Sequence, residues 1–458
     1  MSNASFPVIA APGKLPAFWD RQAIFVANLL GLFFGNEAGT EALAREVGEV
    51  DSYGGRLLPI MDLLFRGGDN LLVLERAPDP ALGRFFSDRL GLGLPQVEVL
   101  PHHEYLTLHH DSIQRHPLFL RLQAHPARWI DGYVTDDTLA DLAGQLGKQT
   151  VSSPAGSRRG NNKRMLHEDM EADGLPIPPT YQAADLGQIA RALDDLKNRG
   201  FRRAVVKAAV GASGIGLNKL PPLAEHEAGE LAARIDPHFF YEGACLVQGW
   251  LEPGVHGVRG LRSPSVQIFV GDEQAELYDI TEQILSDHSV HEGNESPPPY
   301  LAEAGGDELR RQLLARGEWA ARWLYRQGYR GTASADFLLV EHDDGTTEVQ
   351  ICELNARVTG ATYPSVLARR FRPQGAWLLR NLRLRRPLSG AGLLERLQRD
   401  GDLFSPDRRS GVLPVNFNFG TEGLVHKGQF LCLGDQPDEC RRLIERATAG
   451  LDCLAERD

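Results

Sequence analysis

The sequence predicts an N-terminal α/β domain followed by an α+β region whose lobes surround a cleft. Over about the first 150 residues, short apolar segments alternate with helical ones, which favours a parallel, doubly wound sheet. After residue 204, apolar segments follow one another closely, which favours adjacent strands with helices to one side. Asp343-Asp344-Gly345 then marks a tight turn between two of these strands.

Residues 1–155 are predicted to form a Rossmann-like domain. The apolar run at residues 70–74 indicates a short buried strand, and residues 80–90 indicate a helix that follows it. The same order of strand, helix and strand recurs later in the domain. Its remaining elements are predicted strands at 97–100, 129–134 and 150–152 and a helix at 138–146.

Residues 156–385 are predicted to form a second domain, with a lid at about 160–250 and a central lobe at about 251–385. A helix at 162–172 is expected to end at Gly174, because glycine favours a left-handed cap and prolines follow it. The central lobe should contain a long helix at 308–327 and a strand pair at 333–340 and 347–353. The other predicted elements are a helix at 186–199 and strands at 204–208, 244–250, 265–270 and 276–280.

Residues 386–458 are predicted to form a small C-terminal domain. Residues 389–409 are rich in Gly, Arg and Asp, so we expect a mobile segment there. Two strands, at 412–419 and 424–431, should flank a glycine-containing turn, and residues 438–449 should form a closing helix. We expect the basic run at 380–386 to be a solvated helix end, and the alternative is a binding patch.

Composition excludes several classes of function. Lys and Arg total 49 against 61 Asp and Glu, a formal net charge of -12, which disfavours general binding to nucleic acid or a membrane surface. The five cysteines are dispersed without a CxxC pair, which disfavours a disulfide framework or a zinc site. The apolar run at 24–34 is interrupted by Asn28 and Gly31 and is too short to cross a bilayer. With no secretory signal pattern, we expect a cytoplasmic protein.

A candidate metal site lies on the predicted strand pair. Glu353 and Asn355 are two residues apart and therefore share a face of one strand, and Asp336 on the partner strand can join them. Two carboxylates and an amide oxygen suit Mg²⁺, with Mn²⁺ as a possible substitute. Arg357 would place a guanidinium beside the metal, where it can neutralise charge on a transferring phosphoryl group. The alternative is a hairpin with surface carboxylates.

A glycine-rich turn follows a lysine at a strand end. Lys207 precedes a loop that carries glycines and a serine, and glycine lets backbone N–H groups approach phosphates closely. The spacing does not match a P-loop. Together with Lys163, the loop is interpreted as a flap over a nucleotide, although a surface loop and a solvated lysine are the simpler readings. The loop residues proposed to contact the nucleotide are Gly211, Ser213, Gly214, Ile215 and Gly216.

The segment at residues 245–251 is an apolar strand that runs into a hinge. Such a hinge can offer backbone groups to an adenine edge, and its alternative interpretation is a core strand. The residues assigned to this contact are Gln248, Gly249, Trp250 and Leu251.

Taken in order, Lys163, Lys207, the 211–216 loop, the 248–251 hinge, Asp336 and the Glu353-x-Asn355-x-Arg357 segment resemble the ATP-grasp superfamily. The resemblance covers residues 161–364, and the preceding region resembles its pre-ATP-grasp domain. It implies an ATP-grasp fold and a ligase that uses ATP and Mg²⁺ to activate a carboxylate as an acyl phosphate, which an amine then attacks. It also implies that Lys163 and Lys207 contact phosphates and that Arg357 steadies the acyl phosphate. Many members carry a glutamate where this chain has Gln248, so nucleotide contact is expected to be altered there.

Shorter motifs at 263–267, 281–285 and Gly293 resemble the peptide ligase branch typified by the pheganomycin ligase, and the 412–431 region resembles its C-terminal domain. That resemblance implies a role in natural product biosynthesis with amino-acid-like or small peptide substrates. Glu282 could hold an amine or remove its proton, and two arginines could bind a substrate carboxylate. Each of these side chains could equally be an ordinary surface or core group. The substrate candidates are Arg259, Arg262, Ser265, Gln267, Gln283, His291 and Glu292.

Two other functions stay open at this point. One is an enzyme that loads an acyl group onto the phosphopantetheine thiol of a carrier protein. The other is a nucleotide-binding regulatory module without turnover, which the presence of Asp336, Glu353, Asn355 and Arg357 disfavours. A homodimer is the default expectation for the assembly.

Overall fold

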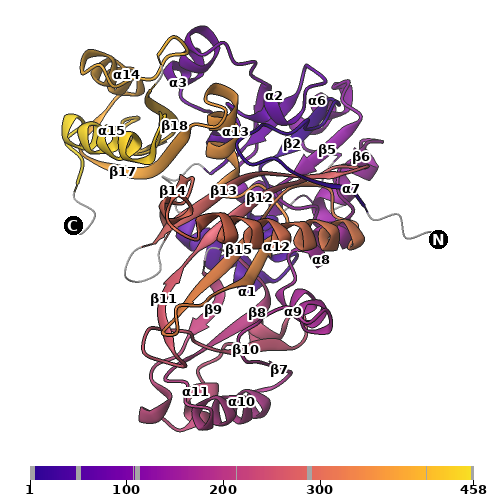
Figure 1. Cartoon of the computed structure of the whole chain (residues 1–458). Coiled ribbons are helices and arrows are strands. Elements are labelled where there is room, and N and C mark those ends of the chain that lie inside the picture. Colours follow the sequence, from indigo (N-terminus) through magenta and orange to yellow (C-terminus); the bar gives the residue numbers. More distant parts are fainter. Residues whose placement is uncertain are drawn as a thin grey trace.

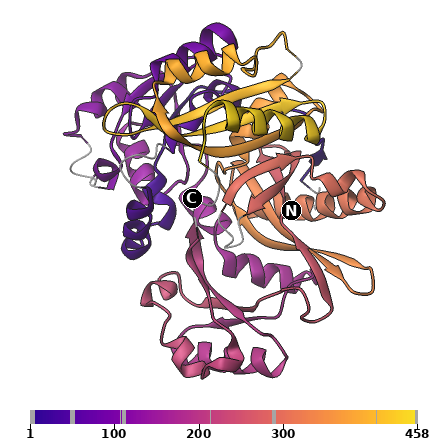
Figure 2. The ribbon, with the colours of Figure 1, turned by 90° about the vertical axis from the view of Figure 1, so that its left-hand side faces the viewer.

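The computed structural model describes residues 6–47, 53–106, 108, 114–212, 214–285, 291–408 and 410–454. Three sheets organise the chain: a parallel sheet near the N-terminus, a four-stranded sheet in the lid and a ten-stranded sheet between them. The lid projects from the rest of the molecule at the bottom of Figures 1 and 2. Across the described part of the chain, no helix has the length and hydrophobicity needed to span a membrane.

The N-terminal sheet has five strands, all of whose pairings are parallel. Its order is β4-β3-β2-β5-β6, which is a doubly wound arrangement and confirms the α/β prediction. The central strand β2 lies in the apolar run that the sequence analysis considered only as a membrane segment. The strands are β2 (Ala23–Val26), β3 (Leu71–Leu74), β4 (Gln96–Val99), β5 (Trp129–Gly132) and β6 (Gln149–Thr150).

Helices of this domain cover both faces of the sheet, as Figure 1 shows. Several begin with a side-chain cap: Asp79 accepts from the backbone N–H of Leu82, and Asp136 accepts from that of Leu139. The helical segments are η1 (Leu29–Phe33), α1 (Glu37–Val47), η2 (Gly54–Leu57), α2 (Met61–Leu64), α3 (Pro80–Arg84), η3 (Phe85–Arg89), α4 (His102–Leu106), α6 (Pro117–Ala124) and α7 (Asp137–Gln145).

The lid is an antiparallel sheet of order β7-β10-β8-β9, packed against two helices. Helices α8 (Pro154–Gly160) and α9 (Lys163–Ala172) lead into it, and α9 is followed by Gly174 at φ 67°, as predicted. The lid elements are β7 (Thr180–Ala183), α10 (Leu186–Asn198), β8 (Ala204–Ala212), β9 (Ile215–Lys219), η4 (Leu223–Glu225), α11 (Ala228–Ala232), η5 (Pro237–Phe240) and β10 (Cys245–Gly249).

The ten-stranded sheet has the order β11-β15-β12-β13-β14-β17-β19-β18, with β1 beside β13 and β16 beside β15. The predicted hairpin is present as β15 and β16. The elements are β1 (Val8–Ala10), β11 (Val258–Arg262), β12 (Pro264–Val270), β13 (Ala275–Leu285), β14 (His291–Ser296), η6 (Pro299–Ala302), α12 (Gly306–Arg326), β15 (Gly331–His342), β16 (Thr347–Asn355), α13 (Thr362–Phe371), β17 (Ala376–Leu388), α14 (Gly390–Arg399), β18 (Gly411–Phe419), β19 (Val425–Gly434) and α15 (Pro437–Gly450).

Strand alternation divides the central sheet into two unlike faces. Val266, Ile268 and Phe337 belong to the apolar cluster that includes Trp323 of helix α12. The residues between them are polar: Ser265 and Asp336 are paired across β12 and β15, and their side chains therefore share the opposite face. We call this second face the inner face. Because one face packs on α12, the polar residues of the other face are free to form a site.

Two predictions for the C-terminal part are wrong. Within the segment expected to be mobile, α14 forms because its Leu393 and Leu397 are buried and Ser389 caps its first turn. The basic run expected to end a helix lies in β17, where buried Leu382 and Leu384 alternate with more exposed arginines. Strand β17 crosses residue 385 and pairs with β19, so the C-terminal segment continues the central sheet.

Candidate active site

The three predicted metal ligands meet at the end of the β15–β16 hairpin. Asp336 and Glu353 are directly paired across the two strands, and Asn355 pairs with Ser334. The amide nitrogen of Asn355 donates to Asp336 Oδ2 at 2.8 Å and to Glu353 Oε1 at 3.4 Å. The three side chains therefore converge on one point of the inner face, as their period-two spacing predicted.

The two carboxylates have opposite electrostatic environments. Burial and the neighbouring Glu353 raise the pKa of Asp336 to about 6, although hydrogen bonds from Ser265 and Ser334 oppose this shift. Burial alone would raise the pKa of Glu353, but Lys163 and Arg357 outweigh burial and lower it to about 2. Glu353 is therefore the carboxylate of the pair that is ionised more readily. A further cation at the site would favour the ionised form of Asp336 as well.

Lys163 connects the base of the lid to this carboxylate pair. Asn162 caps helix α9 by accepting from the N–H of Met165 at 3.0 Å, which fixes the first turn and directs Lys163 toward the sheet. The Lys163 Nζ lies 3.1 Å from Glu353 Oε2 and 3.3 Å from the carbonyl oxygen of Gly211. Lys163 thus contacts both the predicted metal site and the predicted phosphate loop.

Lys207 lies on β8 and is 7 % exposed. Its Nζ donates to Gln248 Oε1 at 2.8 Å and approaches Cys352 Sγ at 3.9 Å. Gln248 in turn donates to Thr180 Oγ1 at 2.8 Å. Gln248 thus accepts from the lysine, and none of these hydrogen bonds joins the Lys207 ammonium to a carboxylate, so the ammonium is available to an anionic ligand.

The structure adds Asn161, which the sequence analysis did not single out. Its Oδ1 accepts from Arg357 Nη1 at 2.9 Å and from the N–H of Ala356 at 3.1 Å. Its Nδ2 donates to the Ala356 carbonyl at 3.2 Å. Asn161 therefore fixes the turn that carries Arg357. The only sequence signal was its position beside Asn162, and that position alone suggests a helix cap.

The glycine-rich loop forms the tip of the β8–β9 hairpin. Gly214 and Gly216 both have φ near 81°, a conformation that side chains with a Cβ rarely adopt. A Cβ on Gly211 would lie 2.5 Å from the Ile215 carbonyl oxygen, so the two strands require glycine there. Ile215 packs against a large apolar cluster. Ser213 lies outside the described residues.

The hinge residues occupy two environments. Gly249 is the end of β10 and packs against the ring of Phe201, which leaves no room for a Cβ. Leu251 packs on the apolar core of the lid. The ring of Trp250 lies under the Lys219 ammonium, 4.1 Å from its centroid. Of these four hinge residues, Gln248 is the one whose side chain accepts a hydrogen bond from Lys207.

The predicted substrate residues lie on different faces of the central sheet. Ser265 and Gln267 are on the inner face, where Gln267 donates to Ser265 at 3.0 Å and accepts from Thr359 at 3.5 Å. Gln283 pairs with Asn294 on the same face. Glu292, also on β14, lies 3.4 Å from Arg380, and His291 begins that strand.

Three other predicted residues do not reach this group. Arg262 pairs in register with Leu339, and Glu282 is two residues from Ile280, so both share the face covered by α12. Glu282 accepts from the Tyr300 hydroxyl at 2.7 Å and from the N–H of Ser263 at 2.8 Å. Arg262 and Arg259 both lie near Glu341. The structure gives Glu282 a structural position, away from the carboxylate pair.

The donor set at the hairpin fits a magnesium ion. Among the described residues, no group of three or more His, Cys, Asp or Glu side chains is suited to a metal, so a softer zinc-type site is not formed by them. Asp336, Glu353 and Asn355 offer oxygen atoms as ligands. The Asn355 side-chain N–H group donates to both carboxylates, and a bound cation would take over this bridging position between them.

Comparison with known proteins decides the fold. The chain aligns over nearly its whole length with biotin carboxylase from Campylobacter jejuni, solved with an ATP analogue (TM-score 0.59, 13% identity, 95% of this chain and 92% of that chain). It aligns similarly with N5-carboxyaminoimidazole synthetase from Staphylococcus aureus in complex with ADP (TM-score 0.53, 11% identity, 94% and 98%). The chain has the ATP-grasp fold. At these identities the likeness concerns the fold alone.

A curated protein is also similar in sequence to this ATP-grasp chain. The [butirosin acyl-carrier protein]–L-glutamate ligase of Niallia circulans is 28% identical over 234 residues, which are 50% of this chain and 51% of that protein. The match thus spans about half the length of each protein. No protein-family model matches the chain. The narrower resemblance to the pheganomycin branch stays a prediction.

Proposed function

We propose that this protein is an ATP- and Mg²⁺-dependent ligase that activates a carboxylic acid as an acyl phosphate and joins it to an amine. The observation that carries the proposal is the convergence of two lysines on the Asp336–Glu353–Asn355 group: Lys163 pairs with Glu353, and Lys207 approaches the neighbouring Cys352 and acts electrostatically on Glu353. Cations for phosphates and oxygen ligands for a metal lie together there. The ATP-grasp fold and the similarity to a ligase support this assignment.

The lysines would hold the nucleotide phosphates. Lys163 now pairs with Glu353, and Lys207 donates to Gln248, so ATP would replace these contacts with phosphate oxygens. The backbone of the 211–216 loop would cover the terminal phosphate, because its glycines permit close approach. The hinge beyond Gln248 would provide the adenine contact.

Asp336, Glu353 and Asn355 would hold the magnesium ion. When bound, the ion would neutralise charge on the phosphates and orient the terminal one. The Asp336 carboxyl, whose pKa burial and Glu353 raise to about 6, is the ligand that gains most from an added cation.

Catalysis would depend on positioning and charge, without a covalent protein nucleophile. A carboxylate oxygen of the acid attacks the terminal phosphorus, the bond to ADP breaks, and an acyl phosphate forms. The amine nitrogen then attacks the acyl carbon, inorganic phosphate leaves, and the nitrogen loses a proton. Arg357, fixed by Asn161, would stabilise negative charge on the acyl phosphate and on the tetrahedral intermediate.

A second candidate keeps the activation step and changes the acceptor. The name of the similar Niallia circulans enzyme describes ligation of L-glutamate to an acyl-carrier protein. By analogy, the acceptor here would be a phosphopantetheine thiol, or an amine already attached to a carrier. The acid would then be an amino acid.

An assay of ADP release, with pairs of amino acids and short peptides, tests the proposal, and mass spectrometry of the mixture identifies the product. ADP that forms only when an acid and an amine are both present, with a joined product, supports amide ligation. Added acyl mass on a phosphopantetheinylated carrier protein supports the second candidate. AMP and pyrophosphate in place of ADP would contradict both, because they indicate an adenylate.

A further inference from the structure

The polar inner face of the central sheet continues well beyond the predicted metal ligands Asp336, Glu353 and Asn355, which we call the metal group. Gln283 on β13 pairs with Asn294 on β14, and Asn381 on β17 pairs with Gln429 on β19. Asn294 and Gln429 are 1 % and 5 % exposed, so these amides are buried. Polar side chains that line a site in this way can form hydrogen bonds with a substrate.

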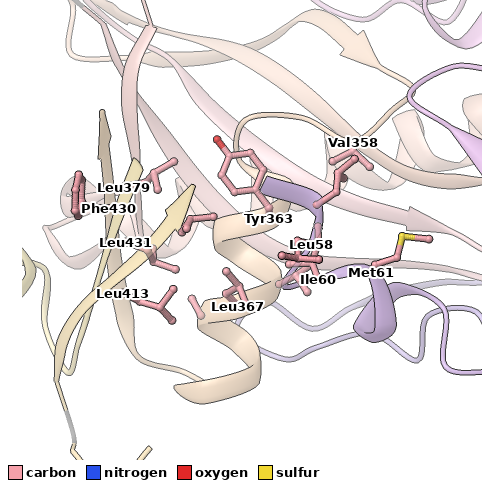
Figure 3. Packing of buried hydrophobic residues seen from close by; sticks show 14 of the residues in the cluster. Leu58, Ile60, Met61, Val358, Tyr363, Leu367, Leu379, Leu413, Phe430 and Leu431 are labelled. Atoms are coloured by element: carbon pink, nitrogen blue, oxygen red, sulfur yellow. The ribbon is translucent and has the colours of Figure 1, made fainter. Parts of the chain in front are cut away.

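At the far end of this strip, the N-terminal domain contributes a guanidinium. Arg56 lies in η2, and its Nη1 donates to the hydroxyl of Tyr363 on helix α13 at 3.2 Å. Its guanidinium carbon lies 4.7 Å from the ring centroid of Tyr53 and 5.1 Å from that of Tyr363. Figure 3 shows the Tyr363 hydroxyl directed away from Leu58, Ile60 and Leu367, at the edge of the apolar cluster. The cation is therefore held between two aromatic rings.

The guanidinium of Arg56 is incompletely paired. Glu75 is a nearby carboxylate that acts on it electrostatically, but among the described residues no carboxylate forms an ion pair with Arg56, and its buried Nε has no hydrogen-bond partner. The same Tyr363 hydroxyl accepts from Gln429 Nε2 at 3.1 Å, and the buried Oε1 of Gln429 also lacks a partner. The Tyr363 hydroxyl thus accepts from two side chains, Arg56 and Gln429. Each of these also carries a buried atom without a hydrogen-bond partner, which is Nε in Arg56 and Oε1 in Gln429. Leaving such groups buried is unfavourable unless a ligand pairs with them.

We propose that Arg56, Tyr363 and Gln429 form a subsite for a substrate carboxylate other than the one that is activated. Arg56 would bind this carboxylate, and Gln429 Oε1 would accept an N–H from the same molecule. The matching ligand is an amino-acid-like group that carries both. The inference rests on the proposed ligase function and specifies its substrate class: one of the two substrates bears a free carboxylate in addition to the reacting groups.

The position of the subsite limits the length of that substrate. Asp336 on β15 and Asn381 on β17 are separated by β12, β13 and β14. At roughly 4.8 Å between neighbouring strands, the subsite lies on the order of 20 Å from the metal group along the sheet. At no more than about 3.6 Å per residue, an acid and an amine bound end to end would need about six residues in total to cover this distance, so they are short peptides.

Two matched substrate pairs test the subsite. L-Glutamyl-L-alanyl-L-alanine against L-glutaminyl-L-alanyl-L-alanine probes a second carboxylate on the acid, and tri-L-alanine against its C-terminal amide probes the carboxylate of the amine. For the full-length protein, kcat and KM from ADP release would be compared with those of Arg56→Gln and Arg56→Lys. We expect Arg56→Gln to raise the KM for the compound that carries the carboxylate about 10- to 100-fold, with little change in its kcat. The KM for the matched compound that carries the amide should change little. Arg56→Lys should be intermediate, because it keeps the charge but not the planar fork.

A binding measurement separates this proposal from the ligase function. Thermal unfolding with the same four compounds should show stabilisation of the wild type by the carboxylate member of one pair, and Arg56→Gln should lose it. Arg396→Gln, which removes an exposed arginine paired with Asp400, serves as the control and should behave like the wild type. Equal KM ratios and equal thermal shifts in the wild type and Arg56→Gln would overturn the subsite. Carboxylate-selective stabilisation without ADP formation would retain it and contradict the ligase.

Discussion

At the scale of single residues, Glu353 contacts both the predicted metal ligands and the lysine at the base of the lid. It faces Asp336 across the hairpin, pairs with Lys163 at 3.1 Å and lies near Asn355. Lys163 and Arg357 hold its pKa well below the usual value, so it is ionised near neutral pH. An anion in this position both orders Lys163 and provides a ligand for a cation.

We predict that Glu353→Gln abolishes ADP formation, with a loss in kcat of about 100-fold or more, while the fold is retained. The amide keeps the shape but cannot neutralise a metal or Lys163. Initial rates at saturating ATP and Mg²⁺, together with circular dichroism, check this. Glu348→Gln, at the other end of the same strand, is the matched control and should leave the rate unchanged. Wild-type turnover by Glu353→Gln would eliminate the proposed magnesium site.

Sequence alone could predict the hairpin group because strand alternation assigns residues to faces. The same rule places Glu282 with Ile280, on the face covered by α12, but the predicted catalytic role followed a family motif and not the alternation. Asn161 was missed because an asparagine before a helix is indistinguishable from a cap. Arg56 was missed because it comes from a different domain, and no local pattern relates it to Tyr363.

At the scale of elements, the two strands of the β8–β9 hairpin approach each other so closely near its tip that Gly211 has no room for a Cβ. We predict that Gly211→Ala raises the KM for ATP about 10-fold, because a Cβ at 2.5 Å from the Ile215 carbonyl forces the hairpin tip to move. Its carbonyl contact with Lys163 would be displaced as well. Steady-state kinetics with varied ATP measures the effect. Gly229→Ala in α11 has open space around the new methyl group and should leave the KM unchanged.

Helix α13 is attached to the central sheet by a buried ion pair. Arg369 Nη2 lies 2.7 Å from Asp279 Oδ1, and Trp377 Nε1 donates to the same carboxylate at 2.9 Å. We predict that Arg369→Met lowers the free energy of unfolding by about 3–5 kcal/mol, because an unpaired carboxylate remains buried. Chemical denaturation measures the change. Arg441→Met removes a half-exposed ion pair with Glu295 and should cost less than about 1 kcal/mol. Equal losses in the two variants would contradict the role of the buried pair.

The elements that were predicted correctly have strong local patterns, such as the apolar strands of the N-terminal sheet and the capped helix α9. The errors occurred where packing outweighs composition. The segment at 389–409 is rich in glycine and charge, yet buried Leu393 and Leu397 stabilise α14. The run at 380–386 is basic, yet pairing with β19 makes it a strand. The predicted boundary at residue 385 falls within β17, which runs from Ala376 to Leu388.

At the scale of the whole molecule, the pH dependence of stability should reflect a buried carboxyl in the N-terminal sheet. Burial raises the pKa of Asp131 to about 7, although the N–H of Gly132 and Arg21 oppose this shift. In the unfolded chain the same carboxyl titrates near 3.9. Between these two values the folded state binds more protons than the unfolded state, so stability falls as pH rises from about 4 to about 7.

We therefore predict that Asp131→Asn removes this component. Relative to the variant, the wild type should lose about 3 kcal/mol of unfolding free energy between pH 4 and pH 7. Denaturation curves at several pH values provide the comparison. A difference between the two proteins that stays constant with pH would show that Asp131 does not titrate in this range.

The arrangement of the three sheets places the lid, the metal group and the N-terminal domain around the inner face of the central sheet. Lysines from α9 and β8, oxygen ligands from β15 and β16, and Arg357 beyond β16 come together there. A homodimer stays a prediction. These residues support the proposal that a carboxylate is activated there by phosphoryl transfer.

Isotope transfer tests that activation step most directly. An acid that supports ADP release would be labelled with ¹⁸O in its carboxylate, and the phosphate formed would be examined by ³¹P nuclear magnetic resonance. The acyl phosphate route predicts one ¹⁸O atom in inorganic phosphate, because the carboxylate oxygen that attacked the terminal phosphorus leaves with it. Unlabelled phosphate, or ¹⁸O in AMP, would contradict the proposed mechanism.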